Sequence, residues 1–255
     1  MPEIAPRVVV VVPTYNERDS LPLLVDQLAD LKFPNLHVLI VDDNSPDGTG
    51  AIADTLAANS HESFGVLHRA RKDGLGRAYV AGMTRALSEG ASIIIQMDAD
   101  LSHPVSTIPE MVQILTTTDA GLVIGSRYVA GGSIATKWPW YRKALSTCAN
   151  CYVNAILSFK VKDATAGFKA WSRAALISVD LASIQSNGYS FQVEMNYRAV
   201  KQGHRIVEVP IRFEEREQGK SKMSTTEQVE SVLTPWKLLL RQKKMMMIPE
   251  REATS

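Results

Sequence analysis

The stretch IIIQMDADLSHP, residues 93–104, leads a run of β-branched residues into two aspartates one residue apart. Successive isoleucines are typical of a strand that is buried on both faces, as in parallel sheets. Ionised carboxylates are costly to bury without partners. Because alternate strand residues point to the same side, Asp98 and Asp100 can be directed at one object, such as a divalent cation carrying phosphates. A helix cap is the alternative interpretation, since Pro104 suits a first helical turn.

On either side of this stretch, apolar runs alternate with segments of helical periodicity. The predicted strands cover residues 8–13, 36–43, 65–69, 92–98 and 121–127. The predicted helices cover residues 21–31, with Ser20 as N-cap, and residues 51–58, 77–87 and 106–115. This alternation predicts an α/β fold, with a mostly parallel, Rossmann-like sheet flanked by helices. In such sheets, ligands bind beyond the carboxyl ends of the strands.

Polar clusters follow four of these strands: PTYNE (13–17), DDNSPDGT (42–49), DADLSH (98–103) and GSRY (125–128). The second cluster is typical of a tight turn over residues 45–48, but a turn does not explain two successive aspartates. One of them suits hydrogen bonding to a ribose or a base. Tyr15 and Glu17 are placed to contact a nucleoside. GLGRAY (74–79) lacks the dinucleotide-binding spacing, so we interpret it as a loop entering a helix, with at most an ancillary ligand contact.

The charge distribution says more than the net charge of +1. Hydrophobic residues make up 45% of the 255 residues and charged residues 22%, which is ordinary for a globular protein. Residues 120–162 contain six lysines and arginines and no acidic residue, which indicates a face that meets an anion. Nucleic acid is not predicted as the partner. The basic stretch is apolar, and the aspartates that follow the predicted strands would repel phosphates without a metal. Cys148 and Cys151 lack a second pair of zinc ligands, and we interpret them as small packing residues.

Residues 139–160 show the pattern of an amphipathic helix. The apolar positions at helical spacing are Tyr141, Leu145, Cys148, Tyr152, Ile156 and Phe159. A core-facing helix is one interpretation, but the neighbouring tryptophans and basic residues favour a helix at a membrane surface. Arg142 and Ser146 lie four residues apart on one face, a workable pocket for a lipid phosphate.

The tail over residues 234–249 carries four basic residues and no acid. It is expected to lie on a membrane or to dock on an integral membrane protein. No apolar run approaches the ~18 residues of a transmembrane helix, and no secretory signal is visible, so no transmembrane helix is predicted.

Together these motifs resemble glycosyltransferase family 2, and within it the dolichyl- and polyprenyl-phosphate mannose synthases. The motifs that carry the resemblance are VPTYNE, VDDNSPDGT, KDGLGRAY, MDADLSHP, GSRYVAGG, WPWYRKALS, GFKAW, GYSFQVEM and EVPIRFEEREQGKSKM. Pro46 matches the mannose synthases, whereas Asn44 replaces a common glycine. The resemblance implies a GT-A catalytic domain over residues 1–230, followed by a basic, apolar C-terminal helix and tail over residues 231–255.

The resemblance also implies an activity: inverting transfer of mannose from GDP-mannose to polyprenyl phosphate. The chain would act as a peripheral protein at the cytoplasmic face of a membrane. Two alternatives stay open: a polyprenyl-phosphate glucosyltransferase that uses UDP-glucose, and a catalytically silent nucleotide-sugar-binding scaffold.

Residue roles follow from the same resemblance. Asp98, Asp100 and Arg127 would be catalytic, and the two aspartates would hold Mg²⁺ or Mn²⁺. Ser102 stands where some relatives place a further metal ligand, glutamine. Arg142 and Ser146 would bind the acceptor phosphate. The residues expected to bind the nucleotide sugar are Pro13, Tyr15, Glu17, Val41, Asp43, Asp98, Ala99, Asp100, Arg127, Arg216 and Lys222.

Overall fold

The valines of strand β1 (Val8–Thr14) alternate between the two faces of a central sheet. Val9 and Val11 belong to one hydrophobic cluster, whereas Val8 and Val10 belong to another on the opposite face. Both clusters are shielded from water, which explains why residues 8–13 are all apolar.

The computed structural model describes residues 5–59, 63–134, 140–214, 230 and 232–240, except the side chain of Arg142. The other strands of the main sheet are β2 (Leu36–Asp42), β3 (Phe64–His68), β4 (Ile93–Gln96), β5 (Ala120–Ser126), β7 (Lys169–Ser172) and β8 (Arg205–Pro210). Their order is β3-β2-β1-β4-β7-β5-β8. β7 is antiparallel to β4 and β5, and the other pairings are parallel. The prediction of a mostly parallel sheet is confirmed.

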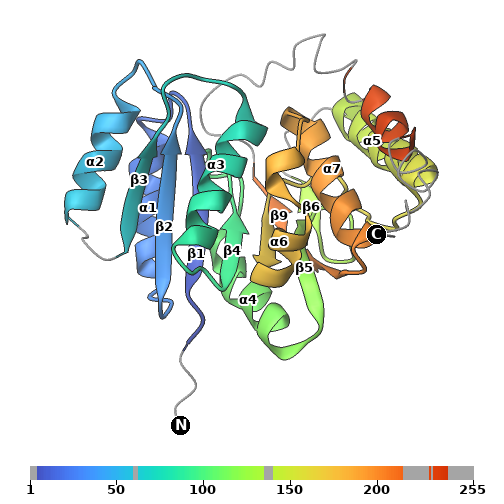
Figure 1. Cartoon of the computed structure of the whole chain (residues 1–255), viewed down its shortest axis with the longest axis horizontal. Helices are drawn as coiled ribbons and strands as arrows, with labels where there is room; N and C mark the ends of the chain where they lie inside the picture. The colour runs from blue at the N-terminus through green and yellow to red at the C-terminus, as the bar shows by residue number, and fades with distance from the viewer. Residues whose placement is uncertain (1–4, 60–62, 135–139, 215–229, 231, 241–255) are drawn as a thin grey trace, which may run out of the picture.

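Helices cover both faces of this sheet (Figure 1). One face is covered by α3 (Leu75–Ser88), α6 (Arg173–Ser178) and α7 (Gly188–Lys201). The other is covered by α1 (Ser20–Asp30), α2 (Thr49–Asn59) and α4 (Ile108–Thr117). Two short strands, β6 (Ser133–Ile134) and β9 (Arg212–Phe213), pair separately in parallel. Each of the five strands and four helices predicted from the sequence is present.

Some element boundaries differ from those predicted. Ser20 is the first residue of α1 and Asp19 is the N-cap, while the Ser20 hydroxyl donates to Oε2 of Glu17 at 2.6 Å. α4 begins at Ile108, two residues later than predicted, because Val105–Thr107 forms a separate 3₁₀ turn.

The predicted amphipathic helix is present as α5 (Trp140–Leu157). It contacts a second helical segment over residues 232–240, and the two lie side by side in Figure 1. Two hydrogen bonds join them: the hydroxyl of Tyr152 donates to the carbonyl of Val232 at 2.6 Å and accepts from Nε1 of Trp236 at 3.0 Å. Among the described residues, no helix has both the length and the apolar content needed to cross a membrane.

The packing role inferred for the two cysteines is wrong. Both Cys148 and Cys151 are exposed. The side of α5 that faces the protein instead presents Asn150, Val153 and Leu157, which are buried. Periodicity alone did not distinguish these two sides of the helix.

Candidate active site

The polar clusters of the sequence meet at one rim of the sheet, formed by the carboxyl ends of the parallel strands. β1 lies between β2 and β4, so the chain turns to opposite sides of β1 and creates a topological switch point there. Pro13 and Val41 are paired across β1 and β2. Tyr15, Glu17, Asp43 and the DAD triplet at residues 98–100 lie in the loops that directly follow these strands.

The loops after β1 and β2 are joined by hydrogen bonds that run from backbone N–H groups of the first to side chains of the second. These bonds link Asn16 to Ser45 (3.1 Å), Glu17 to Thr49 (3.0 Å) and Arg18 to Asp47 (3.3 Å). Partial burial raises the pKa of Asp47, but its hydrogen bonds outweigh this effect and lower the pKa below the usual value. The turn predicted over residues 45–48 is therefore structural, and it fixes the backbone beside Tyr15 and Glu17.

The two successive aspartates have different partners. Asp42 accepts hydrogen bonds from the hydroxyls of Ser45 (2.6 Å) and Thr14 (3.2 Å), which ties it to the interior of the turn. Asp43 pairs with Arg69 at 2.5 Å. Burial raises the pKa of Asp43, and the arginine only partly offsets this effect. The next residue, Asn44, has a φ of 58°, a conformation that asparagine adopts more readily than most residues. This explains how asparagine stands in for the usual glycine.

Basic residues that the sequence analysis missed lie beside Tyr15 and Asp43. The ammonium of Lys72 lies 3.8 Å from the ring centroid of Tyr15, and Arg69 pairs with Asp43. Both belong to the run RARK, residues 69–72, directly after β3. That run was the available sequence signal, because it follows a strand whose carboxyl end lies at the rim.

Asp98 is fixed by a tyrosine from a neighbouring helix. The hydroxyl of Tyr79, which is fully buried in α3, donates to Oδ1 of Asp98 at 2.6 Å. Burial, followed by the charge of Asp98, raises the pKa of Tyr79 well above its usual value, so the tyrosine remains a donor. On the other side, a Cβ atom at Gly167 would lie 3.1 Å from Oδ2 of Asp98. A side chain at position 167 would therefore crowd this carboxylate.

Asp100 is held by the turn that follows it. Both the backbone N–H and the hydroxyl of Ser102 donate to Oδ1 of Asp100, at 3.1 and 2.6 Å. Leu101, between them, has a φ of 62°, which closes the turn tightly. Ser102 is buried, so its hydroxyl orients the carboxylate of Asp100.

The donor set suits a hard divalent cation. Mg²⁺ typically takes one or two protein carboxylates together with phosphate oxygens of its substrate. Asp98 and Asp100 supply two carboxylates at the switch point. Among the described residues, no group of three or more His, Cys, Asp or Glu side chains is placed to hold a metal ion alone. The pair therefore fits a cation that is completed by the ligand's own phosphates.

His103 connects the loop of residues 98–103 to Phe168 and Phe213. Its Nδ1 accepts a hydrogen bond from the backbone N–H of Asp98 at 3.3 Å, which places the ring proton on Nε2. The ring stacks on Phe168, with centroids 5.2 Å apart, and meets Phe213 edge-on at 5.8 Å. The backbone N–H of Glu214 donates to the carbonyl of Ser102 at 3.2 Å.

Arg127 follows β5 and lies on the same rim. The ring centroid of Phe213 lies 5.3 Å from Cζ of Arg127. Because Phe213 also contacts His103, it connects Arg127 to the loop of residues 98–103. Arg127 is also paired with Asp163, a residue that the sequence analysis did not identify. Arg216 and Lys222 lie outside the described residues, so their roles stay predictions.

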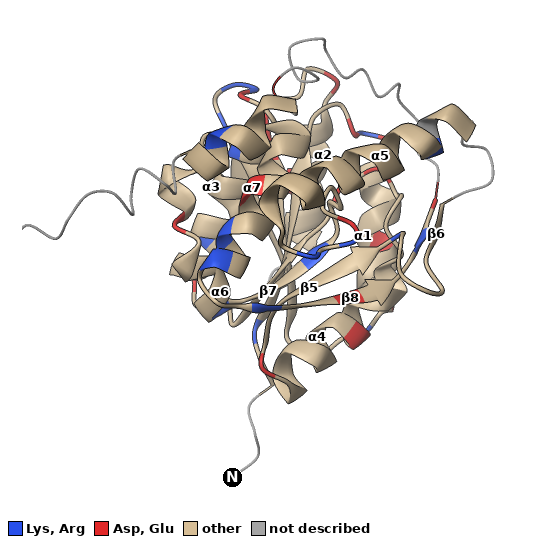
Figure 2. Ribbon diagram, turned by 90° about the vertical axis from the view of Figure 1, so that its right-hand side faces the viewer, with Lys and Arg blue, Asp and Glu red and all other residues tan. Residues whose placement is uncertain are grey.

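At α5, the hydroxyl of Tyr128 donates to the Ser146 hydroxyl at 2.7 Å, which connects this helix to the loop after β5. The side chain of Arg142 lies outside the described residues. The sequence of α5, which is labelled in Figure 2, contains no acidic residue. Exposed large apolar side chains gather on α5 and on residues 232–240, and we call them the apolar face: Trp140, Tyr141, Leu145, Val232, Leu233, Trp236 and Leu240.

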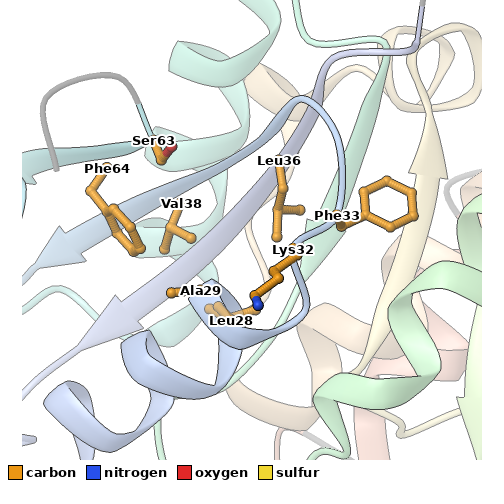
Figure 3. Close-up of a pocket in the computed structure, with 8 residues that line it drawn as sticks. All are labelled: Leu28, Ala29, Lys32, Phe33, Leu36, Val38, Ser63 and Phe64. Carbon is orange, nitrogen blue, oxygen red and sulfur yellow. The ribbon is translucent and has the colours of Figure 1, made fainter.

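A hollow of about 390 Å³ lies at the opposite end of the sheet, near the amino ends of β2 and β3 (Figure 3). Its lining is mainly apolar and includes Leu28, Phe33, Leu36 and Phe64. It contains none of the predicted site residues, so it is separate from the acidic rim.

The chain is similar in sequence to known proteins. Residues 9–179 match the family model described as glycosyl transferase family 2. The chain is 47% identical over 220 residues to a polyprenol monophosphomannose synthase of Mycolicibacterium smegmatis, covering 86% of this chain and 81% of the relative. It is also 47% identical over 237 residues to an undecaprenyl-phosphate mannosyltransferase of Micrococcus luteus, covering 92% and 96%.

Solved structures share the fold at lower identity. A mannosyltransferase from Pyrobaculum calidifontis in complex with GDP-Man and Mn²⁺ is 18% identical, with a TM-score of 0.62 over 92% of this chain and 64% of that chain. A glucosyl-3-phosphoglycerate synthase from Mycobacterium tuberculosis, with Mn²⁺ and UDP bound, is 18% identical, with a TM-score of 0.65 over 93% and 80%. The likeness confirms the predicted α/β fold of the GT-A type.

Proposed function

Because the chain belongs to glycosyltransferase family 2, we propose that it transfers mannose from GDP-mannose to the phosphate of a polyprenyl phosphate. The observation that carries the proposal is the arrangement of Asp98 and Asp100 at the switch point of the sheet. Each carboxylate has one oxygen fixed by a hydrogen bond, from Tyr79 in one case and from Ser102 in the other. The names of the two relatives at 47% identity supply the transferred mannose and the lipid phosphate, and GDP-mannose is the donor that the sequence resemblance implies.

The reaction is a single in-line displacement. An oxygen of the lipid phosphate forms a bond to the anomeric carbon of mannose, while the bond from that carbon to the diphosphate breaks and its electron pair leaves with GDP. One displacement inverts the configuration and gives a β-linked product. The acceptor phosphate has a second pKa of about 6, so it is largely ionised near neutral pH. A general base is therefore unnecessary, and the protein's task is to bind and neutralise two anions.

The residues of the rim divide this task. Tyr15 and Asp43, with Lys72 and Arg69 as their partners, bind the nucleoside side of GDP-mannose. Asp98 and Asp100 would hold Mg²⁺ or Mn²⁺, whose charge stabilises the departing diphosphate. Arg127 supplies a fixed positive charge at the phosphates, where preorganised donors lower the barrier. Arg142 and Ser146 are assigned to the acceptor phosphate.

The apolar face is proposed to lie on the membrane that contains the acceptor lipid. Trp140 and Trp236 are 80% and 52% exposed, and they belong to two helices that are hydrogen-bonded to each other. Amphipathic helices with tryptophan on the apolar side and basic residues beside it are typical of membrane surfaces. Exposed apolar patches of this kind usually mark interaction sites.

A transfer assay tests the proposal. The full chain is incubated with radiolabelled GDP-mannose, polyprenyl phosphate and detergent, with Mg²⁺, with Mn²⁺ or with EDTA. Label should move into the organic phase only when cation and acceptor are both present. Asp100→Asn should abolish this transfer, whereas Asp26→Asn, an exposed residue on α1, should leave it unchanged. Arg142→Ala should raise KM for the lipid phosphate more than KM for GDP-mannose.

Two outcomes would replace the proposal. Transfer from UDP-glucose but not from GDP-mannose would identify the chain as a glucosyltransferase. Nucleotide-sugar binding without turnover toward either donor would identify a silent scaffold. Undiminished transfer by Asp100→Asn would remove the metal role of that residue.

A further inference from the structure

Arg127 is bound along one edge of its guanidinium group by a buried carboxylate. Nε donates to Oδ2 of Asp163 at 2.7 Å and Nη2 donates to Oδ1 at 2.6 Å, a bidentate arrangement. The backbone N–H of Arg127 donates to the same carboxylate at 3.0 Å, and Nη2 also donates to Oγ1 of Thr165 at 3.0 Å. The Asp163 side chain is fully buried and that of Arg127 is 8% exposed.

The segment that carries Asp163 is held by side chains from three different elements. Its backbone groups bind Asn150 and Asn154 of α5, Asn196 of α7 and Glu208 of β8. The individual distances lie between 2.6 and 3.1 Å. Asp163 is therefore a rigid anchor, and the guanidinium that it binds has little freedom to rotate.

The other edge of the guanidinium is left for a ligand. Within the part of the chain that the structure describes, the two Nη1 protons of Arg127 make no hydrogen bond, because the hydrogen bonds of this residue use its backbone N–H, Nε and Nη2 groups. Burial opposes the charged form, but the pairing with Asp163 outweighs this and raises the pKa of Arg127, so the group stays charged. A planar fork held on one side presents its remaining donors in a fixed direction, which suits a phosphate.

We propose that Asp163 is a positioning residue, which holds the Nε–Nη2 edge of Arg127 so that the Nη1 edge faces a phosphate at the rim. The inference rests on the proposed function, in which Arg127 binds a substrate phosphate. It assigns to Asp163 no contact with substrate, because its carboxylate is fully buried and occupied by Arg127.

The main test is Asp163→Asn, which keeps the size of the side chain but removes its charge and one acceptor oxygen. We expect kcat to fall by about 100-fold, as misplacement of a catalytic group by about 1 Å commonly causes. The matched control is Asp119→Asn, which also removes the partner of an arginine, Arg205, but at the exposed opposite end of β5. The control should transfer mannose at the wild-type rate.

A double-variant cycle separates positioning from a general loss of structure. In an Arg127→Met background there is no guanidinium to orient, so adding Asp163→Asn should cause no further loss of kcat. An equal loss in both backgrounds would overturn the inference, because it would show that Asp163 acts independently of Arg127. Wild-type kinetics in folded Asp163→Asn would overturn it as well.

If Asp163→Asn does not fold, Thr165→Val tests the same geometry without changing a charge. It removes one acceptor from Nη2, so a two- to tenfold loss of kcat is expected, about the effect of one hydrogen bond, and none in the Arg127→Met background. No loss in the wild-type background would count against the inference. Failure of the proposed function is recognised separately, because the wild-type chain would then form no lipid product or Arg127→Met would retain full activity.

Discussion

Lys169 provides a test of the buried interior beneath the active site. It lies in β7, and its Nζ donates to Oε1 of Gln192 at 2.8 Å and to the backbone carbonyl of Gln192 at 3.2 Å. Gln96 donates to the same Oε1 at 2.7 Å. Burial lowers the pKa of Lys169 to about 7, from 10.5, and Asp163 offsets this only in part.

The direction of the pH effect follows from proton linkage. Between pH 7 and 10.5, the unfolded chain retains a proton on this lysine that the folded chain has lost. The free energy of unfolding therefore rises with pH across that window, while the cost of burying the ammonium is fully present below pH 7. The whole difference corresponds to roughly 5 kcal/mol, and to about 1.4 kcal/mol for each pH unit inside the window.

Lys169→Met removes this titration. We expect the stability of the variant relative to wild type to fall by roughly 2 to 3 kcal/mol between pH 7.5 and 9.5, because the wild type gains stability there and the variant does not. Urea unfolding followed by tryptophan fluorescence at several pH values measures this difference. Lys162→Met, at an exposed position, is the control and should show no such trend. A difference between Lys169→Met and wild type that stays constant with pH would refute the reasoning.

Three further predictions concern the rim and the apolar face. Tyr79→Phe keeps the stacking on Phe191 but removes the hydrogen bond to Asp98, so kcat should fall by about 10-fold or more at unchanged melting temperature; equal kcat would contradict the role of that bond. Asp47→Ala removes hydrogen-bond acceptors from the loops after β1 and β2. The free energy of unfolding in urea should fall by about 1–3 kcal/mol. A change near zero would show that the two loops keep their structure without Asp47. Trp236→Ser should weaken co-sedimentation with anionic lipid vesicles. Unchanged vesicle binding by the folded variant would contradict the membrane role of Trp236.

Local sequence signals predicted the strands and most of the rim. Apolar runs such as residues 8–12 are explained by burial on both faces, and the turn formers of residues 45–48 form the expected turn. These features depend on residue patterns within a few positions along the chain, so they can be predicted from the sequence alone. The same holds for Asp98 and Asp100, whose position after a strand places them at the rim.

Contacts between residues far apart in the sequence could not be predicted in the same way. Tyr79 reaches Asp98 from a helix 19 residues earlier, and Asp163 reaches Arg127 from 36 residues later. Nothing in GLGRAY or KDATAG marks these contacts, because each depends on how separate elements pack. The exposure of the cysteines on α5 was missed for the same reason: it depends on which side of the helix meets the protein.

The strand β7 enters the sheet between β4 and β5, although it follows both along the chain. The chain therefore departs from the rim after β5, builds α5, and comes back to the rim to start β7. Both ends of this excursion are anchored at one edge, so residues inserted or deleted within it leave the register of β1, β2 and β4 unchanged. The length of the chain between β5 and β7 can therefore vary without disturbing the strands that lead into Tyr15, Asp43 and Asp98.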